Sequence, residues 1–524
     1  MQSQIDVHIQ VGSVCRRNRR HFPTRSAIVC GGQRLTWREV DEQANALAHS
    51  FARLGAQKGD RIAIIATNSV EWMPIYFGST KAGTVFCPII ARFTDEEMLY
   101  ILEQIEPAVV IVDEQHEAVR DRLQHRLACR PIWVTLADRS HDGFQAYADL
   151  VASGSIDEPQ VDIDDGDLCT IMYTGGTTDM PKGLLYTHKA EYIGNFVSRA
   201  LNWGYGRGTV CLSAGPLYHN GALQKAMLPT CYIAGTFITL PKFDPKEVML
   251  AVERERVTDM VLVAAPLLML LQHPDVGKHD TTSVKRISVG GGNIPDKKLD
   301  QVLNLFPNAE VMYTLGGAEG LGTYLAVRER LEQFGRTPQA KLGSVGFPCW
   351  GVEYKVVGDD GHEVPPGEVG EFMTRDMGAM VGYWRRPDLA REFLQDGWIR
   401  RGDLVRVDEE GVLWFVDRKK DMIKSGGENI YCVEIEAVLR THLALIEAVV
   451  IGVPDEKWGE AVTAVVQLKP GASATAEEII AHCRGHLPGY RCPKAVQFVD
   501  EYPRSAVGKI LKRDLRKRYL HAAY

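Results

Sequence analysis

The chain has 524 residues, of which 45% are hydrophobic and 24% are charged, and its formal net charge is −7. These proportions are ordinary for a soluble globular protein, and the mildly acidic balance argues against nucleic-acid binding, which usually requires a basic domain. No run of apolar residues is long enough to cross a membrane as a helix, and the length allows one large domain plus a small one.

Eleven cysteines are scattered along the chain without a C-x-x-C pair. Their odd number and lack of pattern favour reduced thiols, and the lack of closely spaced ligands argues against a structural zinc site. The N-terminus has no apolar signal-peptide core, so we expect a cytoplasmic protein. A basic cluster at residues 16–21 is interpreted as solvated surface, or at most as a peripheral contact with anionic lipid.

Short apolar runs alternate with amphipathic stretches in the first half of the chain. Strands are predicted at 61–66, 84–90 and 108–112, and helices at 36–54 and 96–105. Thr36 and Glu39 have the spacing of a capping box, and the apolar face of the first helix is formed by Val40, Ala44, Leu47 and Phe51. This alternation predicts an α/β architecture with a mostly parallel sheet.

The most informative motif is the segment TGGTTDMPKG at residues 174–183, which lies between apolar runs at 168–174 and 183–187. Glycines let backbone N–H groups turn toward an anion, and hydroxyls and a lysine add donors and charge. The segment therefore suits a polyphosphate. It lacks the spacing of a Walker A loop. Taken alone, an ordinary surface turn is an equal alternative.

Further strands are predicted at 260–264, 286–289 and 311–315, and the character of the chain changes after about residue 343. Crowded turn signals and short strand-like runs, such as 353–357 and 412–416, indicate an antiparallel β subdomain. The charged run at 417–421 is predicted to be a hinge or linker. Beyond it lies an α/β segment of a size usual for an independent domain.

These widely separated motifs resemble, in their order, those of the adenylate-forming superfamily, which includes acyl-CoA synthetases, nonribosomal peptide adenylation domains and luciferases. The resemblance covers nearly the whole chain. It implies an α/β fold with a large N-terminal domain, residues 1–417, of parallel α/β subdomains plus a β subdomain. It also implies a small mobile α+β C-terminal domain, residues 418–524, that rotates about a hinge near Lys420.

The resemblance assigns the nucleotide site. The residues implied for ATP or AMP binding are Thr174, Gly176, Thr177, Thr178, Lys182, Gly291, Gly292, Leu315, Gly316, Asp403 and Arg418. Thr178 and Glu319 are implied as the residues that hold Mg²⁺, for which hard oxygen ligands are suited. Three positions depart from the common pattern and predict a weaker or reshaped nucleotide site. Asp179 replaces a glycine, Leu315 an aromatic residue and Ala318 a threonine.

Catalysis is assigned by the same resemblance to Lys509, His219 and Glu319. Lys509 would bridge the substrate carboxylate and the α-phosphate, because a cation must neutralise two anions that are brought together. His219 would lie at the mouth of the acyl pocket, whose wall is made of small residues and is expected to be roomy. Coenzyme A would be bound by Ser425, Gly426, Gly427 and Glu428, although a simple turn fits the same residues.

We therefore expect an ATP-dependent carboxylate–CoA ligase that acts through an acyl-adenylate, with ATP, Mg²⁺ and coenzyme A as cofactors and co-substrate. A medium- or long-chain fatty acid is the expected substrate. The alternatives are an aryl or cinnamate-type acid, a stand-alone enzyme that loads a carrier protein, and a non-catalytic nucleotide-binding regulator. The expected partners are small molecules rather than nucleic acid, and a homodimer is the oligomer considered.

Overall fold

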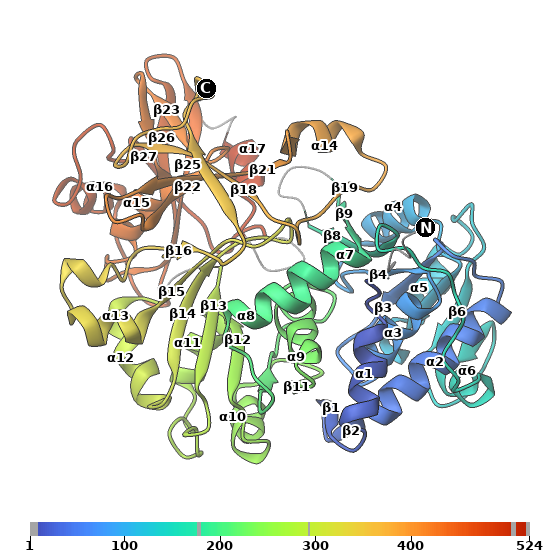
Figure 1. The fold of residues 1–524 in the computed structure, drawn as a ribbon. Helices are drawn as coiled ribbons and strands as arrows, with labels where there is room; N and C mark the ends of the chain where they lie inside the picture. Colours follow the sequence, from blue (N-terminus) through green and yellow to red (C-terminus); the bar gives the residue numbers. More distant parts are fainter. Residues whose placement is uncertain (1–8, 176–179, 292–293, 505–509, 520–524) are drawn as a thin grey trace, which may run out of the picture. The chain divides into compact units, whose positions relative to one another are not determined.

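The computed structural model describes residues 9–175, 180–291, 294–504 and 510–519 (Figure 1). The described residues form two compact units. The first is drawn from Met1–Thr174, Pro181–Glu353 and Thr374–Ile399, and the second from Gly175–Met180, Tyr354–Met373 and Arg400–Tyr524. The second unit includes residues that precede 418, and the domain boundary between residues 417 and 418 stays a prediction.

The first unit contains an eight-stranded sheet whose central strands are parallel. In order across the sheet, its strands are β19 (Gly382–Tyr383), β9 (Lys182–Thr187), β8 (Leu168–Thr174), β4 (Val85–Pro88), β3 (Arg61–Ile65), β5 (Val109–Val112), β6 (Ile132–Thr135) and β7 (Phe144–Ala146). Every residue of β5 is buried, which is typical of a parallel sheet covered on both faces. The five strands predicted in this region are confirmed, with ends that shift by at most a few residues.

The helices that accompany this sheet in the sequence are α1 (Ser13–His21), α2 (Trp37–Arg53), α3 (Trp72–Lys81), α4 (Asp95–Ile105), the 3₁₀ turn η1 (Glu114–His116), α5 (Ala118–Leu123) and α6 (Tyr147–Ser153). The predicted capping box begins α2. Thr36 Oγ1 accepts a hydrogen bond from Glu39 N at 3.3 Å, and the Glu39 carboxylate accepts one from Thr36 N at 2.7 Å. The sequence signal for this helix start is therefore confirmed.

A nine-stranded sheet forms the rest of the first unit. In order, its strands are β16 (Phe347–Pro348), β15 (Thr323–Ala326), β14 (Glu310–Leu315), β13 (Arg286–Gly290), β12 (Asp259–Val263), β10 (Val210–Leu212), β11 (Thr236–Thr239), β1 (Ser26–Cys30) and β2 (Gln33–Thr36). Strands β12, β13 and β14 are parallel neighbours, so their carboxyl ends lie at the same edge. The strands predicted at 260–264, 286–289 and 311–315 are confirmed.

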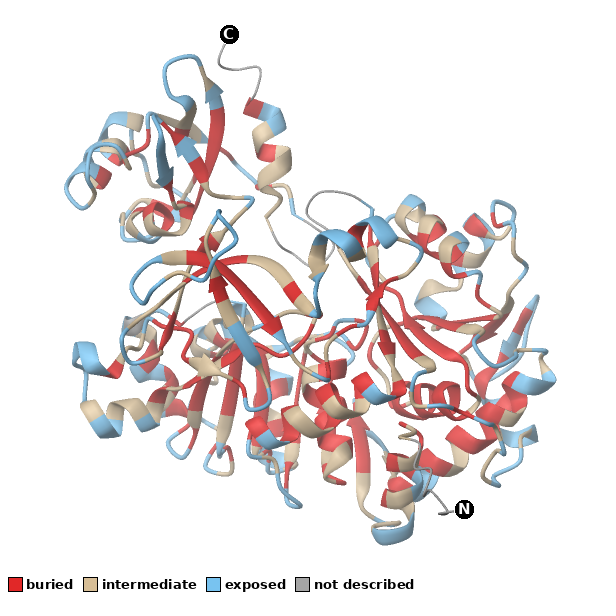
Figure 2. Ribbon diagram, turned by 45° about the horizontal axis from the view of Figure 1, so that its top comes forward, coloured by how far each residue is buried: buried red, intermediate tan, exposed pale blue. Residues whose placement is uncertain are grey.

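One face of this sheet packs against helices that follow its strands. Alternate residues of β12 and β13, such as Met260, Leu262 and Ile287, join a buried apolar cluster with residues of the helices, and Figure 2 shows these strands as largely buried. The helices in this part of the chain are α10 (Pro245–Arg254), α11 (Ala264–Gln272), α12 (Asp296–Leu305), α13 (Val327–Phe334) and the 3₁₀ turn η4 (Pro338–Ala340). The packing fixes the strand ends that position the site.

Two stretches between β9 and β11 are π-helical. The first, η2 (Glu191–Ser198), lies between α7 (His188–Ala190) and α8 (Arg199–Asn202), and the second, η3 (Leu223–Met227), runs into α9 (Leu228–Tyr232). π-Helical turns are rare and are often found at functional sites. Both stretches contribute residues to the site described below.

A second group of strands forms the β subdomain that the turn signals predict. Its order is β17 (Glu353–Val357), β18 (Val369–Arg375), β21 (Trp398–Val407) and β20 (Leu394–Gln395), with β22 (Leu413–Arg418) paired to β21; helix α14 is Pro387–Phe393. The prediction that residues 417–421 form a linker is wrong for its first two residues. Asp417 and Arg418 belong to β22, and Asp417 is buried. The antiparallel pairing with β21 extends the strand to this point.

The C-terminal sheet has the order β24 (Glu428–Ile430), β23 (Ile423–Ser425), β26 (Gly459–Leu468) and β25 (Leu445–Asp455), with β27 (Ala495–Phe498) paired in parallel to β26. Alternation along β25 divides its side chains between two apolar clusters. Val450 packs with α15 (Cys432–Leu439) and α16 (Ala476–Arg484). Ile451 packs with α17 (Lys512–Tyr519). Helices therefore cover both faces of this small sheet.

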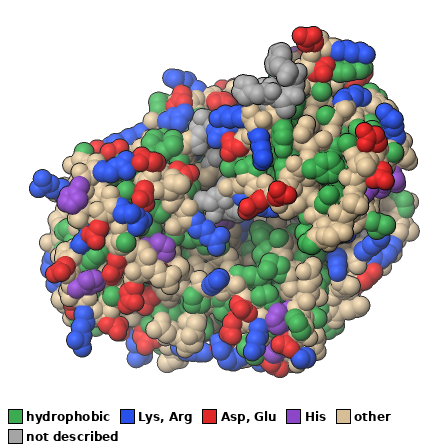
Figure 3. All heavy atoms as spheres, turned by 180° about the vertical axis from the view of Figure 1, so that it is seen from behind, with side chains coloured by type: hydrophobic (Ala, Val, Ile, Leu, Met, Phe, Trp, Pro, Cys, Tyr) green, Lys and Arg blue, Asp and Glu red, His purple; other side chains and the backbone are tan. Residues whose placement is uncertain are grey.

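Acidic and basic side chains are interspersed on the face of the molecule shown in Figure 3. Exposed side chains of opposite charge also form ion pairs, such as Arg122 with Asp95 at 2.8 Å. Exposed pairs of this kind contribute little stability. In the part of the chain that the structure describes, no helix has the length and apolar character needed to cross a membrane.

Candidate active site

The polyphosphate motif begins and ends on paired antiparallel strands. Thr174, the last residue of β8, lies opposite Lys182, the first residue of β9. The Lys182 ammonium lies 5.3 Å from the centroid of the Phe393 ring, a cation–π distance that steadies the lysine. Four residues between these ends, Gly176, Thr177, Thr178 and Asp179, lie outside the described residues. The structure thus places a threonine and a cation at the base of the motif.

The carboxyl ends of the parallel strands β13 and β14 supply the next group of predicted residues. Gly291 follows β13 with a φ of +73°, a conformation that favours glycine. Leu315 ends β14, and Gly316 follows it. Ligands of parallel α/β sheets bind beyond the carboxyl ends of the strands, so these residues lie where a ligand is expected. Gly292 is outside the described residues.

Glu319 is half-buried and lies close to this edge. A Cβ atom added at Gly317 would lie 1.9 Å from Glu319 Oε2, so only glycine at 317 allows the carboxylate to occupy this position. Carboxylate oxygens are hard donors and fit the preference of Mg²⁺. The second predicted metal residue, Thr178, is not described. Over the described ranges, no group of three or more His, Cys, Asp or Glu side chains is arranged to hold a metal ion.

His219 follows Pro216 in a tight turn of the first unit. Its backbone N donates to Pro216 O at 3.0 Å, and its Nδ1 accepts from Gly221 N at 3.1 Å. The ring keeps an exposed surface, yet desolvation by the surrounding protein, together with the nearby charge of Lys225, lowers the pKa of His219 to about 4. The imidazole is therefore neutral at pH 7, which suits orientation or gating rather than charge neutralisation.

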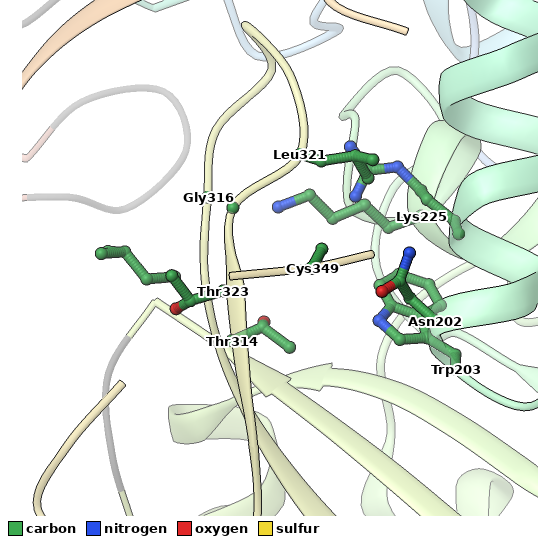
Figure 4. A pocket seen from close by; sticks show the side chains of 11 residues that line it. Asn202, Trp203, Lys225, Thr314, Gly316, Leu321, Thr323 and Cys349 are labelled. Atoms are coloured by element: carbon green, nitrogen blue, oxygen red, sulfur yellow. The ribbon is translucent and has the colours of Figure 1, made fainter. Parts of the chain in front are cut away.

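A pocket in the first unit borders Leu315 and Gly316. It is lined by Arg199, Asn202, Trp203, Lys225, Thr314, Leu315, Gly316, Leu321, Gly322, Thr323 and Cys349. Figure 4 shows the side chain of Lys225 extending toward Gly316, with Asn202 and Trp203 beside it. Sequence reasoning did not identify Arg199 or Lys225, because neither residue lies in a motif. Lys225 lies in the π-helical stretch η3, and Arg199 begins α8 directly after the π-helical stretch η2. Neither π-helical stretch could be recognised from the sequence pattern.

A buried polar network is joined to this pocket through its lining residue Arg199. Glu191 is completely buried, and burial raises its pKa. Its carboxylate accepts hydrogen bonds from Thr170 Oγ1 at 3.1 Å, Asn195 Nδ2 at 2.5 Å and Gln224 Nε2 at 3.0 Å. Asn195 Oδ1 in turn accepts from Arg199 Nε at 2.8 Å. A buried network of this kind holds its members in one arrangement.

In the second unit, Asp403 and Arg418 come together across a strand pair. They are opposite residues of β21 and β22, and Arg418 Nε lies 2.7 Å from Asp403 Oδ1. Asp403 is buried, whereas Arg418 is partly exposed. Lys420 lies in the turn that follows β22. Its neighbour Lys419 contacts the Glu371 carboxylate at 3.2 Å.

The predicted coenzyme A segment forms a tight hairpin. Ser425 and Glu428 are paired residues of β23 and β24, and Gly426 and Gly427 connect them with φ values of +60° and +85°. Positive φ at both central residues is typical of a type I′ turn and favours glycine. Trp458, which the sequence did not reveal, packs on Gly426. A Cβ atom added at Gly426 would lie 3.1 Å from Trp458 Cε3. Lys509 lies outside the described residues.

Comparison with known proteins gives matches over most of the chain. Residues 15–384 match the model of the AMP-binding enzyme family, and residues 434–509 match that of the AMP-binding enzyme C-terminal domain. A feruloyl-CoA synthase of an Amycolatopsis species is 33% identical over 97% of this chain and 99% of its own length. A long-chain fatty acid–CoA ligase of Mycobacterium tuberculosis is 34% identical over 93% of each chain.

The fold also matches a solved structure. The crystal structure of ATP-bound MatB from Rhodopseudomonas palustris superposes with a TM-score of 0.86 at 26% sequence identity, over 99% of this chain and 100% of that one. The likeness therefore extends over both compact units in their chain order.

Proposed function

The chain belongs to the AMP-binding enzyme family, in its acyl-CoA synthetase branch of acid–thiol ligases, and from this premise we propose that it joins a carboxylic acid to coenzyme A through an acyl-adenylate. The observation that carries the proposal is the register of β21 and β22, which brings Asp403 beside Arg418. A buried carboxylate next to a guanidinium suits recognition of the two ribose hydroxyls of ATP.

The proposed reaction has two steps. A carboxylate oxygen attacks the α-phosphorus of ATP, the bond to the β-phosphate breaks, and pyrophosphate leaves. The thiolate of coenzyme A then attacks the acyl carbon, and AMP leaves. Lys182 and Lys509 would neutralise charge in the first step, since two anions must approach each other. Neutral His219 would orient the acid at the pocket.

Mg²⁺ is the metal that this chemistry requires. Glu319, with its carboxylate folded over Gly317, and Thr178 would hold it, and when bound it neutralises phosphate charge. In the second step, Ser425, the Gly426–Gly427 turn and Glu428 would border the coenzyme A thiol, because glycines permit a close approach to the backbone. Rotation of a small C-terminal domain, residues 418–524, about Lys420 would alternate the two arrangements.

For the acid substrate, we propose a chemical class and not a single compound. A medium- or long-chain fatty acid stays the prediction, and an aryl acid is supported equally, because the similar proteins include a feruloyl-CoA synthase and a long-chain fatty acid–CoA ligase. Leu315 would contact adenine through an aliphatic side chain instead of a ring. We propose coenzyme A as the acceptor and a carrier protein as the alternative.

Pyrophosphate release tests the proposal directly. The full chain is incubated with Mg-ATP and a panel of aliphatic and aromatic acids, and we expect release with some acids only. Addition of coenzyme A should then give AMP and a thioester, whereas a phosphopantetheinylated carrier protein should not replace it. Absence of acid-dependent pyrophosphate release over the whole panel would refute a catalytic role and favour a nucleotide-binding regulator.

A further inference from the structure

Strand β9 begins at Lys182, the lysine of the polyphosphate motif, and its outer neighbour β19 comes from a distant part of the chain. Tyr383 of β19 lies opposite Leu184 of β9. Beyond this pairing, Trp384 N donates to Gly183 O at 2.8 Å. Figure 1 shows β19 beside β9, with α14 next to it. The segment therefore follows β9 as far as the residue next to the lysine.

Helix α14 brings one aromatic ring back to this lysine. Phe393 is the last residue of the helix, and its ring centroid lies 5.3 Å from Lys182 Nζ, within the range of a cation–π interaction. The ring of Tyr383 lies beside that of Phe393, with centroids 5.9 Å apart, and Tyr383 is buried. A residue of the strand that pairs with β9 thus supports the ring that contacts the ammonium.

The ring holds the ammonium without neutralising it. Over the described ranges of the chain, Lys182 forms no ion pair with a carboxylate, and its recorded side-chain contact is this ring. A carboxylate in the same place would offset the positive charge and would repel an approaching phosphate. The face of a phenylalanine ring attracts a cation through its quadrupole but carries no net charge. The ammonium therefore stays available for an anion.

We infer that Phe393 is a positioning residue that places the Lys182 ammonium for the phosphates of ATP before the nucleotide binds. This inference rests on the proposed function, in which Lys182 neutralises charge in the first step, and it adds a residue that acts through that lysine. A lysine side chain has several rotatable bonds, and a side chain ordered in advance need not be ordered on binding. The effect belongs to the adenylate-forming step, because only that step involves a polyphosphate.

Replacement of the ring tests the inference on the full chain. Phe393→Leu keeps an apolar side chain but removes the π face, and it should lower kcat/KM for ATP in acid-dependent pyrophosphate release by about 3- to 10-fold. Phe393→Tyr keeps the face and should retain most of the original value. Replacement of Phe393 by pentafluorophenylalanine keeps the ring shape but reverses its quadrupole, so the loss should be at least as large as with leucine.

The second half-reaction shows whether the effect is specific. Thioester formation from supplied acyl-adenylate and coenzyme A should change by no more than about twofold in each of these variants. Lys182→Met should itself lower pyrophosphate release, and adding Phe393→Leu to it should cause little further loss, because the ring acts through the ammonium.

Phe334→Leu is the matched control. Phe334 of α13 is also half-buried, and its ring centroid lies 4.3 Å from Arg330 Cζ, but this pair belongs to no predicted site. The variant should leave both half-reactions unchanged. Thermal unfolding of each variant shows whether it is folded.

The remaining outcomes overturn the inference. Equal losses in both half-reactions, or losses that add in the double variant, would mean that Phe393 supports the fold independently of Lys182. Unchanged pyrophosphate release in a folded Phe393→Leu variant would remove the ring from the site, and the proposed function would stand if Lys182→Met still lowered that release. Absence of acid-dependent release in the unaltered chain would overturn the proposed function itself.

Discussion

Asp403 and Arg418 are separated by a hairpin in the sequence, yet they face each other across β21 and β22 with Nε and Oδ1 2.7 Å apart. The antiparallel register alone brings them together, because opposite residues of such a pair lie close enough for their side chains to interact. The buried carboxylate and the partly exposed guanidinium form a polar pair within the second unit.

Replacing Asp403 by asparagine should weaken ATP binding. The variant keeps the shape of the side chain but removes the charged acceptor, so we expect the KM for ATP to rise by about 10- to 100-fold, the effect of losing one charge-assisted hydrogen bond to a ribose hydroxyl. Glu353→Gln is the control, because it breaks an exposed ion pair with Arg375. An unchanged KM for ATP in a folded Asp403→Asn variant would remove this residue from the nucleotide site.

The Gly426 hairpin should matter to the thioester step. Gly426→Ala forces a side chain into a positive φ and against Trp458, so we expect a stability loss of roughly 1–2 kcal/mol. We also expect thioester formation to slow by about tenfold, because a small displacement of a reacting group is costly. The rate of pyrophosphate release should be nearly unchanged.

Gly411→Ala is the matched control for this hairpin. Gly411 has a φ of +81° and no atom within 4 Å of an added Cβ, so its substitution causes the same backbone strain without the contact. Both variants should lose similar stability in urea denaturation. If Gly411→Ala also slowed the thioester step, the effect would be general destabilisation and not a property of the coenzyme A segment.

Much of this fold follows from the sequence pattern. The run at 108–112 is apolar throughout and the run at 61–66 is apolar after Arg61, and both form largely buried parallel strands. Thr36 with Glu39 marks the start of α2, as its capping chemistry requires. These predictions depend on local chemistry. The prediction of a linker at 417–421 depended on charge alone. It was wrong at Asp417 and Arg418, because both residues pair with β21 and therefore belong to β22.

The candidate site also contains residues that a local motif reveals and residues that only tertiary packing brings together. Residues within motifs, such as Asp403 and Gly426, could be selected from the sequence because those motifs resemble the motifs of the family. Arg199 and Lys225 lie in no such motif, and they meet at one pocket although Arg199 belongs to α8 and Lys225 to η3. Tertiary packing of this kind has no local signature. A lone arginine or lysine in a sequence is usually just solvated surface.

Acid should destabilise the protein through His188. This histidine is completely buried, and Val11 N donates to its Nδ1 at 3.2 Å. Burial lowers its pKa to about 4, whereas an unfolded histidine titrates near its ordinary value of about 6.5. Between these values the unfolded state binds a proton that the folded state does not. Stability is therefore present above pH 6.5 and is lost as the pH falls toward 4, by about 3 kcal/mol.

Urea denaturation between pH 7.5 and 4.5 measures this loss. A folded His188→Gln variant should be less stable at neutral pH but should show a pH dependence that is flatter by the same amount, since the titrating group is gone. The exposed His125→Gln variant serves as control and should follow the original curve. Parallel curves for the original chain and the His188 variant would mean that other groups cause the acid sensitivity.

Lys509 should separate the two half-reactions. Its predicted task is to neutralise the approach of a carboxylate to the α-phosphate, where the charge of two anions must be offset in the transition state. We therefore expect Lys509→Ala to lower acid-dependent pyrophosphate release by about 100- to 1,000-fold. Thioester formation from supplied acyl-adenylate and coenzyme A should continue, because no second anion has to be brought to phosphorus in that step.

The control for this experiment is Lys517→Ala, which changes an exposed lysine of α17 and should affect neither step. Comparison of the two variants excludes a general effect of removing a positive charge near the C-terminus. An equal loss of both half-reactions in Lys509→Ala, with unfolding temperatures unchanged, would mean that the lysine supports the C-terminal domain as a whole. Because the adenylate is supplied in the second assay, a slow first step cannot imitate that result, and the division of labour between Lys509 and the Gly426 hairpin would have to be abandoned.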